Sequence, residues 1–294
     1  MNPNRSIRCQ NNDGVSMTFG NSFAPFLLED AIGIYGADAK VVTSENTMID
    51  GSTYQSSIMK MRNIVLTLRD RPTDDHQAMR SKLYELFKFK QPGTLTFTKN
   101  GIERQIQYYV EEIQADAVKR ARVYTISLIC PSPFFEETSD TIVEMGGWED
   151  AFTFPHTFTS AGETFGNRIV AFLQTIENTS AAENIGLRFV IDAIGPATNP
   201  SFTLVETSEH IQIGTESNPF TMERGDRLVI TTGRANKHVL YTHEGTTTEI
   251  NNRISGDSEF LQLGRGLNTF GYNADSGASN LIVTIIYRFL YEGI

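Results

Sequence analysis

Two histidine positions could bind a metal ion or move a proton. His243-Glu244 begins like the zinc motif HExxH, in which two histidines hold the metal and the glutamate acts as the base. Residue 247 is Thr, so the second ligand is absent. His238 lies five residues before His243, and on a strand this spacing directs the two side chains to opposite faces. We therefore expect ordinary strand histidines and no metal site.

Asp74-Asp75 could supply a paired general acid and base. The residues that follow have helical spacing, and carboxylates at a helix start accept hydrogen bonds from free N–H groups near the positive end of the helix dipole. This position favours capping over catalysis. Gly264-Arg265-Gly266 resembles a fragment of a phosphate-binding loop, but it lacks the strand-to-helix context and predicts a turn.

Other signatures of catalysis do not occur in the sequence. It has no GxSxG elbow, no GxxxxGKS/T loop and no CxxC pair. Cys9 and Cys130 are the only cysteines, and the first residues lack the apolar stretch of an export signal, so we expect free thiols in a reducing cytosol. We predict a protein that is not an enzyme, with no catalytic, metal-binding or cofactor-binding residues and no cofactor.

Two further features leave alternatives open. Lys119-Arg120-Ala121-Arg122 is a basic run between two expected strands, either a solvated loop or a contact with an acidic partner. Trp148-Glu149 either packs at the entrance to a second domain or presents an aromatic platform to a sugar. Neither feature assigns an interface residue.

The charge of the chain changes near its midpoint. The 294 residues suffice for about two domains of roughly 150 residues, and the net charge of −10 argues against a protein that coats DNA. Residues 1–135 hold 16 basic and 14 acidic residues, whereas residues 136–294 hold 9 basic and 21 acidic. This step, with Pro131 and Pro133 beside it, predicts domains 1–135 and 136–294. No apolar run approaches the ~20 residues of a membrane helix, so no membrane contact is expected.

The first half has the period-two pattern of strands with one buried face. Ile64, Leu66 and Leu68 alternate with Val65, Thr67 and Arg69, and Tyr124–Cys130 repeats the pattern. Asn100-Gly101 predicts a tight hairpin turn, because both residues accept positive φ. One helix is expected over Asp74–Lys88, where apolar residues recur at helical spacing and can pack on the sheet: Ala78, Met79, Leu83, Leu86 and Phe87. Thr73 or Asp74 could cap it, and Lys88 and Lys90 lie at its far end.

The second half contains short strands separated by turn residues, and no helix is needed there. Such spacing is typical of an all-β sandwich or barrel. The expected strands are Arg168–Thr175, Leu187–Ile194, Phe202–Val205, His210–Ile213, Arg227–Thr232, His238–Thr242, Glu259–Leu263 and Leu281–Tyr291. The last of these is expected to be the longest.

Several stretches, in order, resemble the distal tail proteins of long-tailed bacteriophages that infect Gram-positive hosts. In that family an Asp-Gly pair is followed about ten residues later by an Arg that leads a strand, as Asp50-Gly51 and Arg62–Leu68 are here. A helix and a hairpin follow. Ile129–Glu136 (ICPSPFFE) is similar to the Pro-rich, aromatic-acidic stretch that closes the family's first domain.

The end of the chain also resembles that family. The family has Gly-x-Asn-x-Phe, then a loop of Asp-Ser-Gly type, then an aromatic-basic final strand. The corresponding stretches here are Gly266–Phe270, Asp275-Ser276-Gly277 and Ile286–Tyr291.

The resemblance implies a mainly β fold. The expected parts are an N-terminal β-sandwich or split barrel with one α-helix, and a C-terminal galectin-like β-sandwich that projects outward. It implies a structural hub at the distal end of the tail, where a hexameric ring joins the tail tube to the tip or baseplate and lets DNA pass.

The resemblance also implies partners and a location. The partners are further copies of this chain in a homohexamer or in stacked rings, the tail tube protein, the tail-tip or tail-associated hub protein, and receptor-binding proteins. DNA only passes through the bore. The protein would be assembled in the host bacterial cytoplasm and reside in the virion tail.

The alternative function is a carbohydrate-binding adhesin module of the same particle, in which the acidic second domain binds cell-wall glycan. The galectin-type sugar motifs, His-x-Asn-x-Arg and Trp-x-x-Glu, do not occur in the sequence. The resemblance therefore does not extend to lectin activity. Mass in solution separates the two functions, because a hub forms closed rings and an adhesin module need not.

Overall fold

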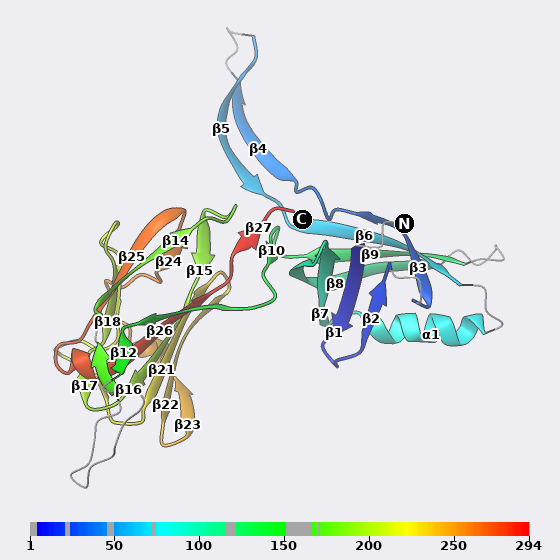
Figure 1. The fold of residues 1–294 in the computed structure, drawn as a ribbon. Helices are drawn as coiled ribbons and strands as arrows, with labels where there is room; N and C mark the ends of the chain where they lie inside the picture. Colours follow the sequence, from blue (N-terminus) through cyan, green and yellow to red (C-terminus); the bar gives the residue numbers. More distant parts are fainter. Residues whose placement is uncertain are drawn as a thin grey trace. The chain divides into compact units, whose positions relative to one another are not determined.

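The computed structural model describes residues 5–20, 24–45, 50–71, 75–115, 122–150, 166–169 and 171–293. The chain forms two compact units (Figure 1). The first comprises Met1–Thr138 together with Leu290–Ile294, and the second comprises Ser139–Phe289. The last residues of the chain thus lie in the first unit.

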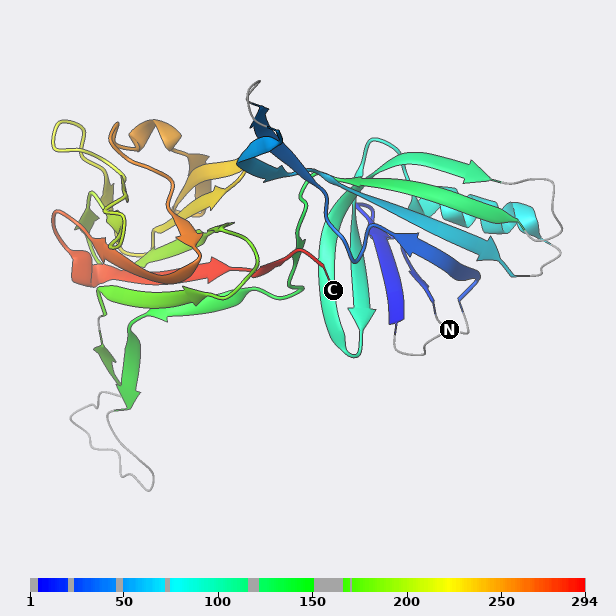
Figure 2. The same ribbon diagram turned by 90° about the horizontal axis from the view of Figure 1, so that it is seen from above.

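The first unit is built on one antiparallel sheet of nine strands (Figures 1 and 2). Seven form a continuous path in the order β2-β1-β7-β8-β9-β6-β3, and β10 pairs with both β8 and β27. The strands are β1 (Arg5–Asn11), β2 (Ser16–Phe19), β3 (Phe26–Ile32), β6 (Arg62–Asp70), β7 (Pro92–Lys99), β8 (Ile102–Ala115), β9 (Val123–Cys130), β10 (Phe135–Glu136) and β27 (Leu290–Tyr291).

Strict alternation places one face of β6 and β9 in the core. Ile64, Leu66 and Leu68 of β6 are fully buried, and Ile126 and Leu128 face them across the β6–β9 pair. Since strand side chains alternate between faces, the register alone buries this whole set. The expected strands are confirmed here.

The helix is shorter than expected. α1 spans His76–Leu86, and Asp75 caps it by accepting a 2.8 Å hydrogen bond from the Ala78 N–H. Leu83 and Leu86 are fully buried, as expected, while Thr73 and Asp74 lie outside the described residues. The next residue, Phe87, stacks on Phe19 of β2 with ring centroids 6.2 Å apart. The apolar stripe therefore packs against the sheet.

The predicted hairpin turn joins β7 to β8. Asn100 and Gly101 have φ values of +54° and +83°, and Lys99 pairs with Ile102. Both central residues therefore adopt the left-handed conformation that a type I′ turn requires.

Two strands of the first unit form a separate sheet. β4 (Ala39–Glu45) and β5 (Ser52–Met59) pair only with each other among the described residues. We call this hairpin the arm, and Figure 1 shows it extending from the sheet of its own unit.

The second unit has two main antiparallel sheets, β11-β26-β16-β21-β22-β23 and β14-β25-β18-β19, with three strand pairs, β12-β13, β15-β24 and β17-β20. The strands are β11 (Thr141–Met145), β12 (Gly147–Asp150), β13 (Gly166–Ile169), β14 (Leu173–Asn178), β15 (Asn184–Gly186), β16 (Arg188–Ala193), β17 (Ala197–Thr198), β18 (Ser201–Leu204), β19 (His210–Gln212), β20 (Thr221–Met222), β21 (Arg227–Gly233), β22 (Asn236–His243), β23 (Thr246–Glu249), β24 (Gln262–Gly264), β25 (Gly266–Asn273) and β26 (Leu281–Tyr287). Two short 3₁₀ turns, Asn251–Arg253 and Ala278–Asn280, are the helical segments within the described part of this unit.

Aromatic side chains from both main sheets meet in the core of the second unit. Phe189 of β16 lies 5.0 Å from Phe202 of β18 and 5.9 Å from Phe270 of β25, measured between ring centroids. All three rings are fully buried. The unit is therefore a sandwich of two sheets, and the mainly β prediction is confirmed.

Three expected strands of the second half were wrong in their bounds. The predicted Arg168–Thr175 is divided between β13 and β14, and the predicted Glu259–Leu263 is reduced to β24. The predicted Leu281–Tyr291 ends at Tyr287, and Leu290-Tyr291 pairs instead with β10 of the first unit. Alternation continues through Arg288-Phe289, but periodicity carries no information about which sheet a strand joins.

No helix in the described part of the chain has the length and apolar character needed to cross a membrane.

Candidate assembly interface

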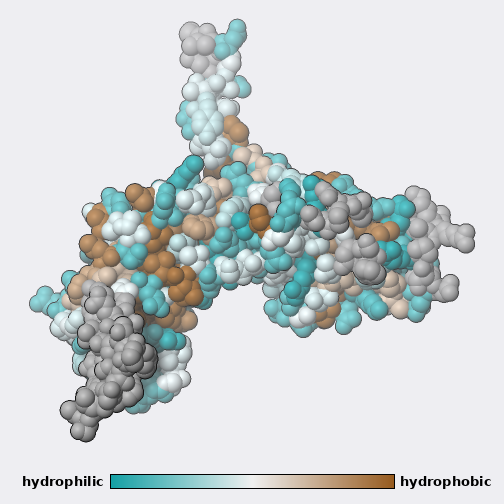
Figure 3. Space-filling view, viewed as in Figure 1, coloured by the Kyte–Doolittle hydropathy of each residue, from teal (hydrophilic) through white to brown (hydrophobic). Residues whose placement is uncertain are grey.

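The arm exposes apolar side chains that its own unit does not cover. All of β4 and the first seven residues of β5 are exposed, including Tyr54 (61%) and Ile58 (62%). Its apolar residues gather in the half nearer the sheet, while Ser, Thr and Glu occupy most of the outer half (Figure 3). An isolated two-stranded hairpin is marginally stable in water. The arm is thus a surface suited to a partner.

The base of the arm is held tightly. Gly33 has φ +85°, and a Cβ there would lie 2.0 Å from the carbonyl oxygen of Asn63. Only glycine fits at this approach of two backbones. On the other side, the Lys60 N–H donates to the Asp38 carbonyl at 2.8 Å. The arm therefore leaves the sheet at a defined point.

Arg62, the first residue of β6, is buried beside this base with only 4% of its surface exposed. Its Nη1 donates to the carbonyl oxygens of Gly33 and Gly36, both at 2.6 Å, and to that of Ile34 at 3.3 Å. Its Nε donates to Pro133 at 2.9 Å.

Two further contacts complete the surroundings of Arg62. Its Nη2 donates to the carbonyl of Glu292, and its guanidinium lies 4.9 Å from the centroid of the Phe135 ring. Burial lowers the pKa of Arg62, although nearby Cys130 and Glu292 oppose that shift. A guanidinium has five fixed donors, so backbone carbonyls from several segments can satisfy it.

The resemblance singled out Arg62 and the PSPFFE stretch without assigning either a role. In the structure they converge, because Pro133 and Phe135 both contact Arg62. One signal in the sequence could have found this: Arg62 has the same parity as buried Ile64 and Leu66, which places a cation on the core face.

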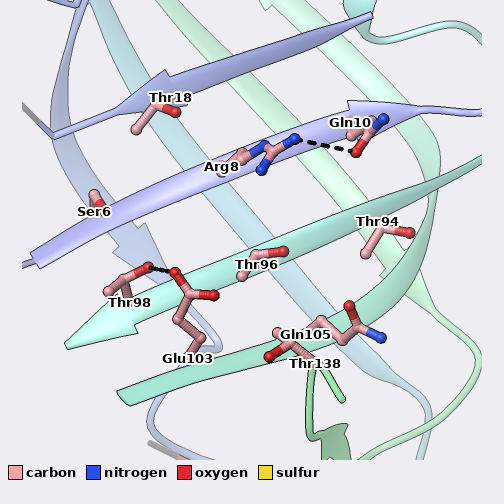
Figure 4. Close-up of a pocket in the computed structure, with 10 residues that line it drawn as sticks. All are labelled: Ser6, Arg8, Gln10, Thr18, Thr94, Thr96, Thr98, Glu103, Gln105 and Thr138. Carbon is pink, nitrogen blue, oxygen red and sulfur yellow. Dashed lines mark hydrogen bonds between the residues drawn. The ribbon is translucent and has the colours of Figure 1, made fainter. Parts of the chain in front are cut away.

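The outer face of β1, β7 and β8 forms a polar trough of about 400 Å³ (Figure 4). Hydroxyl and amide side chains line it, and Arg8 and Glu103 are its two charged residues. Thr98 donates to Glu103 at 3.3 Å. A second hollow, which shares Gln10 and Thr94, extends the trough without adding a charged residue. The trough is therefore nearly neutral. The lining residues are Ser6, Arg8, Gln10, Thr18, Thr94, Thr96, Thr98, Glu103, Gln105 and Thr138.

The histidines in the described part of the second unit have separate carboxylate partners. His243 Nδ1 lies 2.7 Å from Asp226 Oδ1, and His238 Nδ1 lies 2.6 Å from Glu249 Oε1. Within the described residues, no group of three or more His, Cys, Asp or Glu side chains could hold a metal ion. Glu244 belongs to the turn between β22 and β23. The His243-Glu244 pair is therefore explained by its place at the end of a hairpin strand.

Sequence reasoning missed the network around Asp226. The Tyr241 hydroxyl and the Glu223 N–H both donate to its Oδ2, the latter at 2.8 Å. Burial alone would raise the pKa of Asp226, but these hydrogen bonds and that with His243 outweigh it, and the pKa is lowered. The hydrogen bond and the charge of Asp226 in turn raise the pKa of His243. The network anchors one end of β22 to the turn before β21.

The other candidates have structural positions or lie outside the described residues. Gly264-Arg265-Gly266 forms the turn between β24 and β25. Cys9 and Cys130 are free and buried, and burial raises the pKa of both thiols, that of Cys130 to about 12. Residues 119–121 lie outside the description, as do the side chains of Trp148-Glu149, whose backbone lies in β12.

The C-terminal motifs of the resemblance also stabilise turns. Asn268 accepts from the Gly264 N–H at 2.8 Å and donates to the carbonyls of Gly264 and Gly266, both at 2.8 Å. Asn199 donates to Asp275 at 2.6 Å. These side chains close loops by hydrogen bonds and are already engaged within the fold.

Comparison with known proteins identifies the class of the first unit. Residues 13–130 match the family model of the phage tail protein RIFT-related domain. No curated protein sequence matches the chain.

Solved structures match the chain along its whole length. The Dit (gp 19.1) protein of phage SPP1, described as a paradigm of the hub adsorption apparatus in phages infecting Gram-positive hosts, matches with a TM-score of 0.66 and 12% identity over 97% of this chain and 98% of that one. A chain of the phage p2 baseplate in its activated conformation, solved with Sr and with Ca, matches with a TM-score of 0.52 and 10% identity over 99% of both chains.

Residues 13–130 therefore match a phage tail protein RIFT-related domain. The fold of the chain is that of the SPP1 Dit protein. The resemblance to siphophage distal tail proteins is confirmed.

Proposed function

We propose that this protein is a structural, non-catalytic hub at the distal end of the tail, in which six copies form a ring. The observation that carries the proposal is the exposed arm on a phage tail domain, within a chain whose complete fold matches a protein described as a hub. The tail tube protein would bind one side of the ring and the tail-tip or baseplate protein the other, with receptor-binding proteins as further partners.

The arm supplies the contact between neighbouring copies. Val41, Tyr54 and Ile58 would be buried against the adjacent subunit, which offsets the poor stability of a lone hairpin. A head-to-tail contact of this kind closes into a ring when its rotation closes. Two rings could also stack.

The distribution of charge supports a ring made by the first unit. The first unit, which adds Glu136, Glu137 and Glu292 to residues 1–135, has 16 basic and 17 acidic residues, a net charge of −1. The second has 9 basic and 18 acidic residues, a net charge of −9. Six copies of the second unit repel one another when close, whereas six copies of the first repel little. We assign the second, as a galectin-like sandwich, to the periphery.

The polar trough is suited to the passage of DNA through the ring. Its hydroxyl and amide side chains offer few fixed charges, with Arg8 balanced by Glu103. Phosphates are held chiefly by several Lys or Arg contacts, so a neutral polar lining lets a polyanion slide without being bound. We assign this face to the bore.

Native mass spectrometry of the full chain tests the ring. We expect about six times the subunit mass of 32.8 kDa, or twice that for stacked rings. Ile58→Asp should lower the ring fraction, while Ile142→Asp, an equally exposed isoleucine of β11 (61% against 62%), should not. A wild-type monomer at high micromolar concentration contradicts the hub and favours the glycan-binding adhesin.

Thiol labelling tests the position of the trough. In the ring, a bulky maleimide should modify Thr96→Cys much more slowly than Thr247→Cys on exposed β23, while in the monomer the difference should shrink. If the ratio of the two labelling rates is the same in the ring and in the monomer, the trough does not line the bore.

A further inference from the structure

The last residues of the chain are built into the first unit. We call Leu290–Gly293 the strap. Tyr291 and Leu290 pair with Phe135 and Glu136 of β10. The chain leaves the first unit after Thr138 and rejoins it at Leu290, the first residue of the strap.

Side chains fix the strap in place. The Tyr291 ring lies 3.8 Å from the guanidinium of Arg104, measured to the ring centroid, and its hydroxyl donates to Glu137 at 3.0 Å. At Gly293 a Cβ would lie 3.0 Å from the carbonyl oxygen of Tyr35, so the strap also approaches the segment that leads to the arm.

One side chain joins the strap to the base of the arm. Nη2 of Arg62 donates to Glu292 of the strap, while Nη1 donates to Gly33 and Gly36 at the arm base. The guanidinium is planar and rigid. If the carbonyl groups at the arm base shift, the guanidinium must reorient, and its hydrogen bond to the strap changes with it. None of these acceptors is a carboxylate, and the buried cation depends on backbone carbonyl dipoles that only this arrangement of segments supplies.

We infer that Arg62 is a positioning residue for assembly: it orients the arm for docking on a second copy of this chain, and the strap holds Arg62 in the competent geometry. The inference rests on the proposed ring. Arg62 acts through the arm and does not itself contact the neighbour.

Full-length variants with a matched control test the inference. Arg62→Lys keeps the charge but removes the planar fork, and Tyr291→Ala weakens the strap without altering Arg62. Arg69→Lys makes the same substitution on the same strand, at a surface arginine that pairs with Glu29. Hydrogen exchange of the monomer is followed at the arm and at the β6–β9 core, and the ring fraction is measured against concentration.

The expected result is specific to the arm. Arg62→Lys and Tyr291→Ala should each speed exchange in residues 39–59 at least tenfold and raise the concentration for half-assembly at least tenfold, with exchange in β6–β9 unchanged. The double variant should add little to the larger single effect, because both act on one contact network. Arg69→Lys should behave as wild type.

Two results would overturn the inference. In one, both variants keep the arm exchange and ring assembly of wild type. In the other, β6–β9 exchange rises together with that of the arm, which makes Arg62 a general support of the fold. If wild type itself forms no ring, the hub proposal fails, while the exchange of the arm in the monomer still reports whether Arg62 and the strap control it.

Discussion

The arm and the β7–β8 hairpin are both antiparallel strand pairs of the first unit, but they are stabilised differently. In β7–β8 one face is buried, with Leu95 fully covered and Ile106 opposite it. In the arm the apolar residues are exposed, and hydroxyl residues are interspersed among them. The first hairpin is held by its own core, whereas the apolar residues of the second are uncovered in the monomer. In the proposed ring, this difference separates residues that fold the monomer from residues that would assemble it.

The largest contrast should come from truncating one apolar residue in each hairpin. Leu95→Ala should lower the free energy of unfolding by about 2–5 kcal/mol, the usual range for a buried leucine. Ile58→Ala should change it by less than about 0.5 kcal/mol, because this side chain is exposed in the monomer. Denaturant unfolding of monomeric protein measures both. Similar losses would show that the arm packs within its own subunit.

Two glycines with almost equal φ values give the next contrast. Gly101, at φ +83°, has open space around it, and Gly101→Ala should cost about 1–2 kcal/mol from backbone strain alone. Gly33, at φ +85°, faces the Asn63 carbonyl, so Gly33→Ala should cost more and should also disturb the arm. Unfolding curves and arm exchange measure the two effects. If the two costs are equal, the close approach at Gly33 does not constrain the arm base.

The β22–β23 hairpin is an intermediate case, because an exposed strand is anchored by side-chain pairs. Asp226 raises the pKa of His243, so NMR titration should place it above the ordinary 6.5. This pair stabilises the folded state fully below the unfolded pKa of His243 and is lost as pH rises through the raised folded value. Asp226→Asn should return the pKa of His243 toward 6.5. An unchanged titration would assign the shift to another group.

Thiol labelling should distinguish buried residues of the sheet core from exposed residues of the arm in the folded protein. Cys9 and Cys130 lie in the sheet core with raised pKa values, so native protein should react with thiol reagents only on unfolding. Ser57→Cys in the arm should react at once in the monomer and slowly in the ring. Rapid native labelling of either natural cysteine would contradict the closed sheet, and a linked 9–130 peptide would contradict free thiols.

Local patterns in the sequence were enough for much of the core. Alternation identified β6 and β9, Asn100-Gly101 identified the tight turn, and helical spacing identified the buried face of α1, although not its ends. These predictions succeed because a strand or helix with one buried face carries apolar residues at its own period, and this pattern lies within one segment of the sequence. The arm was missed because its apolar residues lack a single buried face, and Asp226 was missed because a lone aspartate in a turn has no local signature.

The sequence by itself determined which residues are apolar at which period, where the chain turns and how charge divides between its halves. The shared parity of Arg62 and Ile64 could also have placed Arg62 on the core face. Only the tertiary structure decided that Arg62 joins the arm base to the strap, and that Leu290-Tyr291 returns to the first unit. The physical reason is that these contacts join segments up to 230 residues apart through backbone groups, which every residue has and no sequence pattern marks.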